Sequence, residues 1–187
     1  PLLWGRNRLL CWLVAWLLGC LVLVGLTRPG CCYVMCQGFA VTDEQLLSYA
    51  RLASKHYAAS TGVVVIITGD VLTVAHVGDS RAALAQVSDG GDVCGTYLTF
   101  DHKPDMPDEL ARIEAAGGSL AYLHGGKPFL RGGDFAERKA AGGRPMQLNY
   151  SRAFGGKDLK PFGLSAVPDV HQMKLTDDHT YVQPTTH

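Results

Sequence analysis

Acidic residues at the ends of predicted strands are the residues of this chain best suited to carry chemistry. Asp79 follows the apolar stretch 71–77, and Asp101 follows a shorter stretch that ends at Phe100. A sheet holds such carboxylates rigidly at a shared cleft, and Mg²⁺ and Mn²⁺ prefer carboxylate and water ligands. Aspartates at these positions also cap turns. The spacing leaves both interpretations open, a cation site and two turn caps, and by itself favours the caps.

Other residue patterns typical of catalysis or of metal binding are missing from the sequence. It contains no G-x-G-x-x-G, Walker or G-x-S-x-G motif, and its seven histidines form no His-x-x-x-His pair. Cys31, Cys32 and Cys36 match no common zinc spacing. They lie close to an apolar run, where cysteines are candidate lipidation sites. That they are ordinary unmodified thiols is an equally good interpretation.

Composition and charge exclude several classes of protein. The chain has 187 residues, 47% hydrophobic and 18% charged, which excludes disorder of the whole chain. Lys plus Arg and Asp plus Glu both number 17, so the charge balance predicts no nucleic-acid partner. The first 40 residues hold three arginines and no acidic residue, which sets them apart from the rest.

Residues 9–26 form an uncharged apolar run. A helix over these residues would be about 27 Å long, close to the hydrocarbon thickness of a bilayer. We therefore expect one hydrophobic helix that anchors the protein in a membrane as a single pass, with the folded part that follows it in the cytosol. A cleaved signal peptide, a buried helix and a wrongly joined gene segment are the alternatives. The predicted domains are accordingly a membrane-anchor-like segment, 1–40, and a folded part, 41–187.

The folded part is predicted to mix helices with strands. A helix begins at Thr42 and ends near Tyr57, and a second, capped by Asp105, ends at the glycine pair 117–118. Residues 131–145 are polar and glycine-rich and indicate a loop or flap, and a helical turn and connector follow over 148–160. The predicted strands are 62–68, 71–77, 81–87, a short one within 93–100, 119–123, 128–130, 169–175 and 179–182. Hairpins interrupted by a helix indicate an α+β fold with a largely antiparallel sheet.

Several segments in a fixed order resemble those of metal-dependent protein phosphatases, the PPM or type 2C family. The quoted segments are VAHVGDSRAAL at 74–84, LTFDHKP at 98–104, DELARIEAAGG at 108–118, YSRAFG at 150–155, KDLK at 157–160 and AVPDV at 166–170. The resemblance extends over residues 60–182, about two-thirds of the chain. They include Asp79, Ser80, Arg81 and Arg152, to which we assign no role from the sequence.

The resemblance implies a fold and a reaction. The fold is an antiparallel β-sandwich flanked by helices, of which this chain would form part. The reaction is hydrolysis of phosphoserine and phosphothreonine in protein substrates by water that two Mg²⁺ or Mn²⁺ ions activate. Asp101 is the residue that aligns with a metal-site aspartate of the family, at its additional third site.

Departures from the family pattern predict weak or absent activity. The segment before Thr42 lacks the family's D-G-H-G-G box, and its D-G-x-x-D box does not follow Val182. The phosphate-binding arginine of the family's first strand has no match, and Gly156 stands where aspartate is common. We therefore expect part of a phosphatase domain with little activity of its own. A membrane-anchored pseudophosphatase that acts as a binding module is the alternative, and a misassembled gene product is a third.

Overall fold

The computed structural model describes residues 11–12, 28–55, 57–87, 90–123, 125–176 and 179–185. Its helices are α1 (Arg28–Leu52), α2 (Pro107–Ala115), α3 (Phe135–Ala140) and the 3-10 turn η1 (Lys160–Phe162). Its strands are β1 (Cys11–Trp12), β2 (Ala59–Ser60), β3 (Gly62–Thr68), β4 (Val71–Val77), β5 (Arg81–Val87), β6 (Val93–Tyr97), β7 (Ser119–Leu123), β8 (Lys127–Arg131), β9 (Gln147–Leu148), β10 (Phe154–Gly155), β11 (Asp169–Lys174) and β12 (His179–Thr185).

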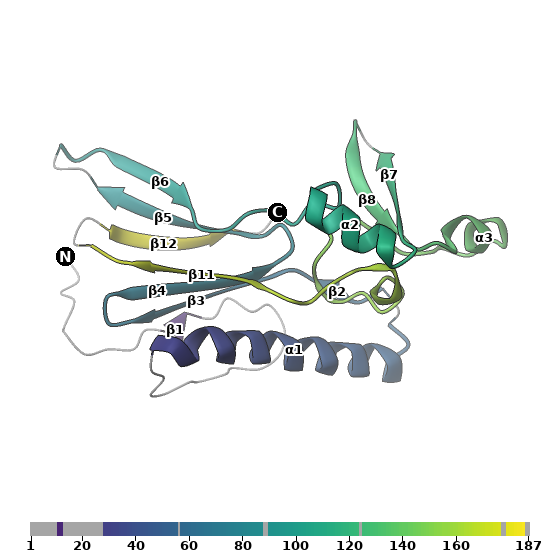
Figure 1. Cartoon of the computed structure of the whole chain (residues 1–187), viewed down its shortest axis with the longest axis horizontal. Coiled ribbons are helices and arrows are strands. Elements are labelled where there is room, and N and C mark those ends of the chain that lie inside the picture. Colours follow the sequence, from purple (N-terminus) through teal and green to yellow (C-terminus); the bar gives the residue numbers. More distant parts are fainter. Residues whose placement is uncertain are drawn as a thin grey trace.

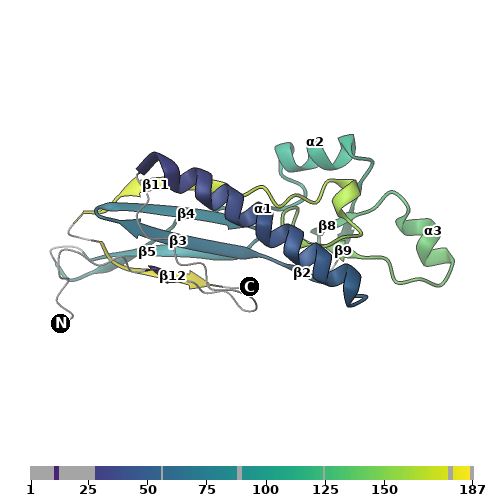
Figure 2. The same cartoon turned by 90° about the horizontal axis from the view of Figure 1, so that it is seen from below.

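Two antiparallel sheets stack over one another, as the phosphatase resemblance implies (Figure 1). One sheet has the strand order β1-β3-β4-β11 and the other β12-β5-β6. The β3–β4 hairpin turns at Gly69, which has a positive φ of 61°, and pairs Gly62 with Val77. Helix α1 lies along the outer face of the first sheet and extends as far as β2 (Figure 2). The layers are therefore sheet, sheet and helix.

Both faces of β4 are buried, which explains its nearly unbroken apolar sequence. Leu72 and Val74 face the second sheet and share a core with Leu84 of β5. Ala75 and Val77 face α1 and pack with Met35 and Phe39. Successive side chains point to opposite faces of a strand, so one short stretch contributes to both cores.

A smaller core lies at the far end of the molecule, where α2 covers the three-stranded sheet β7-β8-β9 (Figure 1). Ile113 of α2 and Leu130 of β8 are fully buried there. The buried residues of this cluster are Ile113, Leu130, Met146, Ala153, Leu159 and Leu164. The last three of these belong to the segment between β9 and β11, so this core attaches that segment to α2.

Helix α1 corrects the first predicted helix, because it begins at Arg28 and not at Thr42. Cys31, Met35 and Phe39 are buried at a spacing of four residues, one turn apart on the face toward the sheet. Packing of this stripe outweighs the low helix propensity of the glycines in this stretch. The helix also crosses the predicted boundary between residues 40 and 41, and the domain division itself stays a prediction.

Smaller differences concern the second helix and the loops. The N-cap of α2 is Met106 and not Asp105, and it makes no side-chain capping bond. The predicted loop 131–145 contains α3. The guanidinium of Arg131 lies over the ring of Phe135, the first residue of this helix, 4.1 Å from its centroid. The predicted connector 148–160 contains strand β10. The predicted helical turn is the 3-10 turn η1, which begins only at Lys160, the last residue of the predicted segment.

The predicted hydrophobic helix over 9–26 is not confirmed. Most of it lies outside the described residues, and Cys11 and Trp12 form the short strand β1, paired with Ile66 and Val65 of β3. In the part of the chain that the structure describes, no helix combines the length and apolar character needed to cross a bilayer.

Candidate functional site

Two aspartates and two cationic residues meet beside the tight turn between β4 and β5. Arg81 donates two hydrogen bonds to Asp101, from Nε to Oδ1 at 2.7 Å and from Nη2 to Oδ2 at 2.9 Å. Lys103 Nζ donates to Asp79 Oδ2 at 2.6 Å and lies 3.6 Å from Asp101 Oδ2. Two positive charges therefore balance two negative ones in this carboxylate–cation cluster.

The turn that carries Asp79 has little freedom. Gly78 has a φ of +89°, and a Cβ at this position would overlap the side chain of Thr61. The hydroxyl of Thr61 in turn shares a 2.7 Å hydrogen bond with that of Ser80. The buried position of Asp79 thus depends on a glycine and on the neighbouring chain before β3.

The cations of the cluster favour the ionised form of Asp101. The hydrogen bond from Arg81 holds the pKa of Asp101 below its usual value, and the charge of Lys103 adds to this effect. The same bond raises the pKa of Arg81. Asp101 is therefore an anion whose two oxygens both accept hydrogen bonds from a guanidinium.

A second cluster surrounds Glu109, which is 3% exposed. Arg112 and Arg152 each donate two hydrogen bonds to its carboxylate, and the hydroxyl of Ser151 donates another. Burial alone would raise the pKa of Glu109, but these donors together hold it far below its usual range. Arg152 also donates to Asp169 Oδ1 at 2.7 Å, so the cluster connects α2 with the start of β11.

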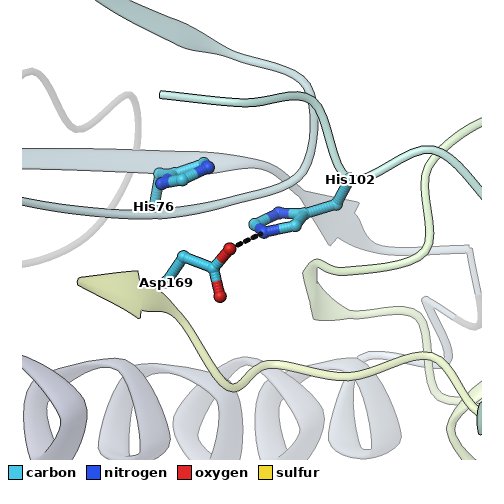
Figure 3. A group of neighbouring side chains, drawn as sticks. All are labelled: His76, His102 and Asp169. Carbon is cyan, nitrogen blue, oxygen red and sulfur yellow. Dashed lines mark hydrogen bonds and ion pairs between the residues drawn. The ribbon is translucent and has the colours of Figure 1, made fainter. Parts of the chain in front are cut away.

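Two buried histidines extend this cluster toward the β4–β5 turn (Figure 3). The rings of His76 and His102 stack with their centroids 4.6 Å apart, and His102 Nε2 lies 3.1 Å from Asp169 Oδ2. Burial lowers the pKa of both histidines, so they are neutral near pH 7. One nitrogen of each histidine and a carboxylate oxygen lie within 4.8 Å of one another, a distance compatible with a shared cation.

The hydrogen bonds of these histidines oppose metal binding. His102 Nδ1 accepts from the N–H of Gly78 at 3.0 Å, so a neutral His102 carries its proton on Nε2 and donates to Asp169. His76 Nε2 donates to the carbonyl of Phe100 at 2.8 Å. His102 thus has no free lone pair, and His76 offers only Nδ1. The group does not fit Mg²⁺ or Mn²⁺, which prefer oxygen ligands.

The carboxylate–cation cluster does not fit a pair of such ions either. A metal at Asp101 would have to displace the bidentate Arg81, and one at Asp79 would have to displace Lys103. Within the described ranges, the histidine group is the one set of three close metal-ligating side chains. The assignment of Asp101 to a metal site stays a prediction.

The structure brings some of the predicted site residues together and separates others. Asp79, Arg81 and Asp101 meet, with Ser80 buried beside them, whereas Arg152 belongs to the cluster of Glu109. The three cysteines of α1, Cys31, Cys32 and Cys36, are free thiols, and Cys31 is only 4% exposed. Lipidation of these cysteines stays a prediction, with the first of them the least accessible.

Sequence reasoning missed Lys103, Glu109, His102 and Asp169 as members of the two clusters. All four lie inside the quoted family-like segments, and this was the available signal. Spacing could not show their roles, because Glu109 meets Arg152 across 43 residues and His102 meets Asp169 across 67.

A comparison with protein-family models decides the affiliation. The model described as protein phosphatase 2C matches residues 31–182. The chain belongs to the protein phosphatase 2C family. The stacked sheets and the motif segments that meet around the two clusters are therefore those of a protein phosphatase 2C domain.

Similar proteins occur in plants and in a protozoan. The chain is 36% identical over 139 residues to probable protein phosphatase 2C 73 of Arabidopsis thaliana, with 74% of this chain and 36% of the relative covered. It is 37% identical to probable protein phosphatase 2C 9 of Oryza sativa, covering 66% of this chain and 25% of that protein. A solved serine-threonine phosphatase 2C from Toxoplasma gondii superposes with a TM-score of 0.76 at 44% identity, over 81% of this chain and 48% of its own. The chain thus spans less than half the length of these relatives.

Proposed function

We propose that this chain supplies part of a protein serine/threonine phosphatase, which hydrolyses phosphoserine and phosphothreonine in protein substrates. The observation that carries the proposal is the protein phosphatase 2C match over residues 31–182. In this family Mg²⁺ or Mn²⁺ would supply the activated water and the charge stabilisation. The residues of this chain hold the two sheets and the β4–β5 turn in place, and the guanidinium of Arg81 keeps Asp101 ionised.

We further propose that the chain by itself is inactive. The charge pairing at the β4–β5 turn supports this, because Lys103 and Arg81 already neutralise Asp79 and Asp101. A divalent cation that binds both carboxylates would have to displace both of these side-chain cations. Displacing Arg81 and Lys103 would break their ion pairs with Asp101 and Asp79 at partly buried side chains, which is costly.

The test is phosphate release from a phosphothreonine peptide by the purified chain in millimolar Mn²⁺, with a complete protein phosphatase 2C as positive control. We expect release no faster than the peptide blank, and no heat of Mn²⁺ binding in calorimetry. Manganese-dependent turnover that EDTA abolishes would contradict the inactivity. Phosphate release that persists in EDTA would contradict the family-level function, because the activity would not depend on a metal ion.

A membrane-anchored pseudophosphatase that binds partners is the second candidate. The paired carboxylates favour a role without catalysis, and the apolar run 9–26 would provide the anchor. With this run at the membrane, the phosphatase region would lie on the cytosolic side. The double variant Leu17→Arg, Leu18→Arg should then move the protein from the membrane pellet to the soluble fraction. Equal fractionation of both proteins would exclude the anchor.

A further inference from the structure

His102 contacts three of the other family-like segments. Its backbone N–H donates to the carbonyl of Gly78 at 3.0 Å, and the N–H of Gly78 donates back to its Nδ1 at 3.0 Å. Its carbonyl accepts a hydrogen bond from the backbone N–H of Ser151 at 2.9 Å. Its Nε2 meets Asp169 at 3.1 Å (Figure 3). One buried residue therefore joins the segments 74–84, 150–155 and 166–170 to its own.

Its neighbours hold the imidazole in one orientation. The ring stacks on His76 at an interplanar angle of 12°, and the bond from His76 to Phe100 fixes that second ring. Flipping the ring of His102 would separate both nitrogens from their partners. Because Gly78 can only donate at this point and a carboxylate can only accept, the two contacts together specify the neutral Nε2–H tautomer.

The two contacts of His102 with Gly78 act on the carboxylate–cation cluster. Asp79 follows Gly78 directly, and Lys103 follows His102 directly. The Asp79–Lys103 ion pair therefore has both of its residues next to this doubly hydrogen-bonded junction. A side chain at Gly78 would overlap that of Thr61, so the turn requires glycine at this position.

We propose that His102 is a positioning residue of the phosphatase site. As an Nε2–H imidazole, it places the Gly78–Asp79 turn, and with it the Asp79–Lys103 pair, against the segment that carries Asp169. The proposal rests on the proposed function, because the site in question is that of a phosphatase. Its test uses no activity, so an active or an inactive chain leaves the outcome unaffected.

Two variants separate the two contacts of the ring. In His102→Asn, the amide oxygen lies as far along the side chain as Nδ1, so it can accept from Gly78 but cannot reach Asp169. In His102→Gln, the amide nitrogen lies as far along as Nε2, so it can donate to Asp169 and leaves Gly78 without an acceptor. The two changes are similar in polarity and are matched controls for each other.

The first measurement is hydrogen exchange of the Gly78 amide by NMR, with the amide of Val74 in β4 as the internal reference. We expect exchange about tenfold faster in His102→Gln, and within about threefold of the wild type in His102→Asn, as for the loss or retention of one hydrogen bond. Equal exchange of Gly78 in the two variants would overturn the proposal.

The second measurement is the coupling of His102 to the ion pair. Lys103→Met should lower the unfolding midpoint of the wild type and of His102→Asn, and should lower that of His102→Gln much less, because the pair is already displaced there. The same loss in all three backgrounds would contradict a positioning role.

A third measurement needs no variant and so does not depend on how well the variants fold. Imidazole ¹⁵N spectra of the wild type at pH 7.5 should show His102 with an unprotonated Nδ1 and a protonated Nε2. The opposite tautomer, or a rapidly exchanging mixture of the two, would overturn the proposal.

Discussion

At the scale of single residues, charge pairing explains most of the two clusters. Glu109 receives hydrogen bonds from Arg112, Arg152 and Ser151, and Asp101 receives two from Arg81. A buried carboxylate is tolerated only when such donors replace the lost water. The arginines in turn need the carboxylate to balance their charge. A single substitution in the cluster therefore leaves a charge uncompensated and lowers stability.

Glu109→Gln should destabilise the protein by about 3 kcal/mol, because it leaves two arginines facing a neutral amide in a buried site. The free energy of unfolding from urea titration measures the effect. Glu114→Gln, an exposed change on the same helix, is the matched control and should change stability by less than about 0.5 kcal/mol. Similar losses for the two variants would show that the cluster contributes little.

At the scale of elements, burial of both faces distinguishes β4 from β3, whose residues are all only partly buried. The β-branched sequence of 62–68 predicts a buried strand, and the apolar sequence of 71–77 predicts its hairpin partner; the observed strands have these bounds, although β3 is less buried than predicted. Helix α1 is different. The half that precedes Thr42 is stabilised by the sheet that covers its apolar stripe and not by a local signal in the sequence. Phe39 packs on Phe154 of β10 there, with ring centroids 5.0 Å apart.

Phe39→Ala should lower the unfolding free energy by about 3 kcal/mol, since it leaves a cavity between α1 and the sheet. Tyr33→Ala lies on the same helix at a side chain that is 67% exposed, and it should have little effect. Chemical denaturation of both variants checks the expectation. A Phe39→Ala protein as stable as the wild type would mean that the first half of α1 is not part of the folded core.

At the scale of the whole molecule, motif segments from distant parts of the chain converge on the β4–β5 turn. His76 and His102 are neutral in this network because burial lowers the pKa of each, and the nearby Arg152 acts in the same direction. The pKa of Asp101, of Glu109 and of Asp169 is also lowered. All five groups therefore bind fewer protons in the folded chain than in the unfolded one.

Stability should fall with decreasing pH in two stages. Below about 6.5, the ordinary histidine pKa, the unfolded chain takes up protons that the folded histidines do not, so the unfolding free energy declines. Below the ordinary glutamate pKa of 4.5, the carboxylates that are kept ionised in the fold add a second decline. Urea midpoints between pH 8 and pH 3.5 measure both stages, and His76→Gln should flatten the first. A midpoint that stays constant from pH 8 to pH 5 would contradict this account.

Elements whose burial follows a local pattern could be predicted from the residues alone. The hairpin strands, α2 with its glycine end, and the order of the family-like segments were predictable from alternation, turn residues and motif identity. The tertiary structure alone decided the first half of α1 and α3. It also decided that Asp79 and Asp101 meet cations and that His102 joins four segments. Local periodicity reports only which face of an element is apolar. The partners of Asp101 and His102 lie 20 and 67 residues away in the sequence, and only folding brings them together.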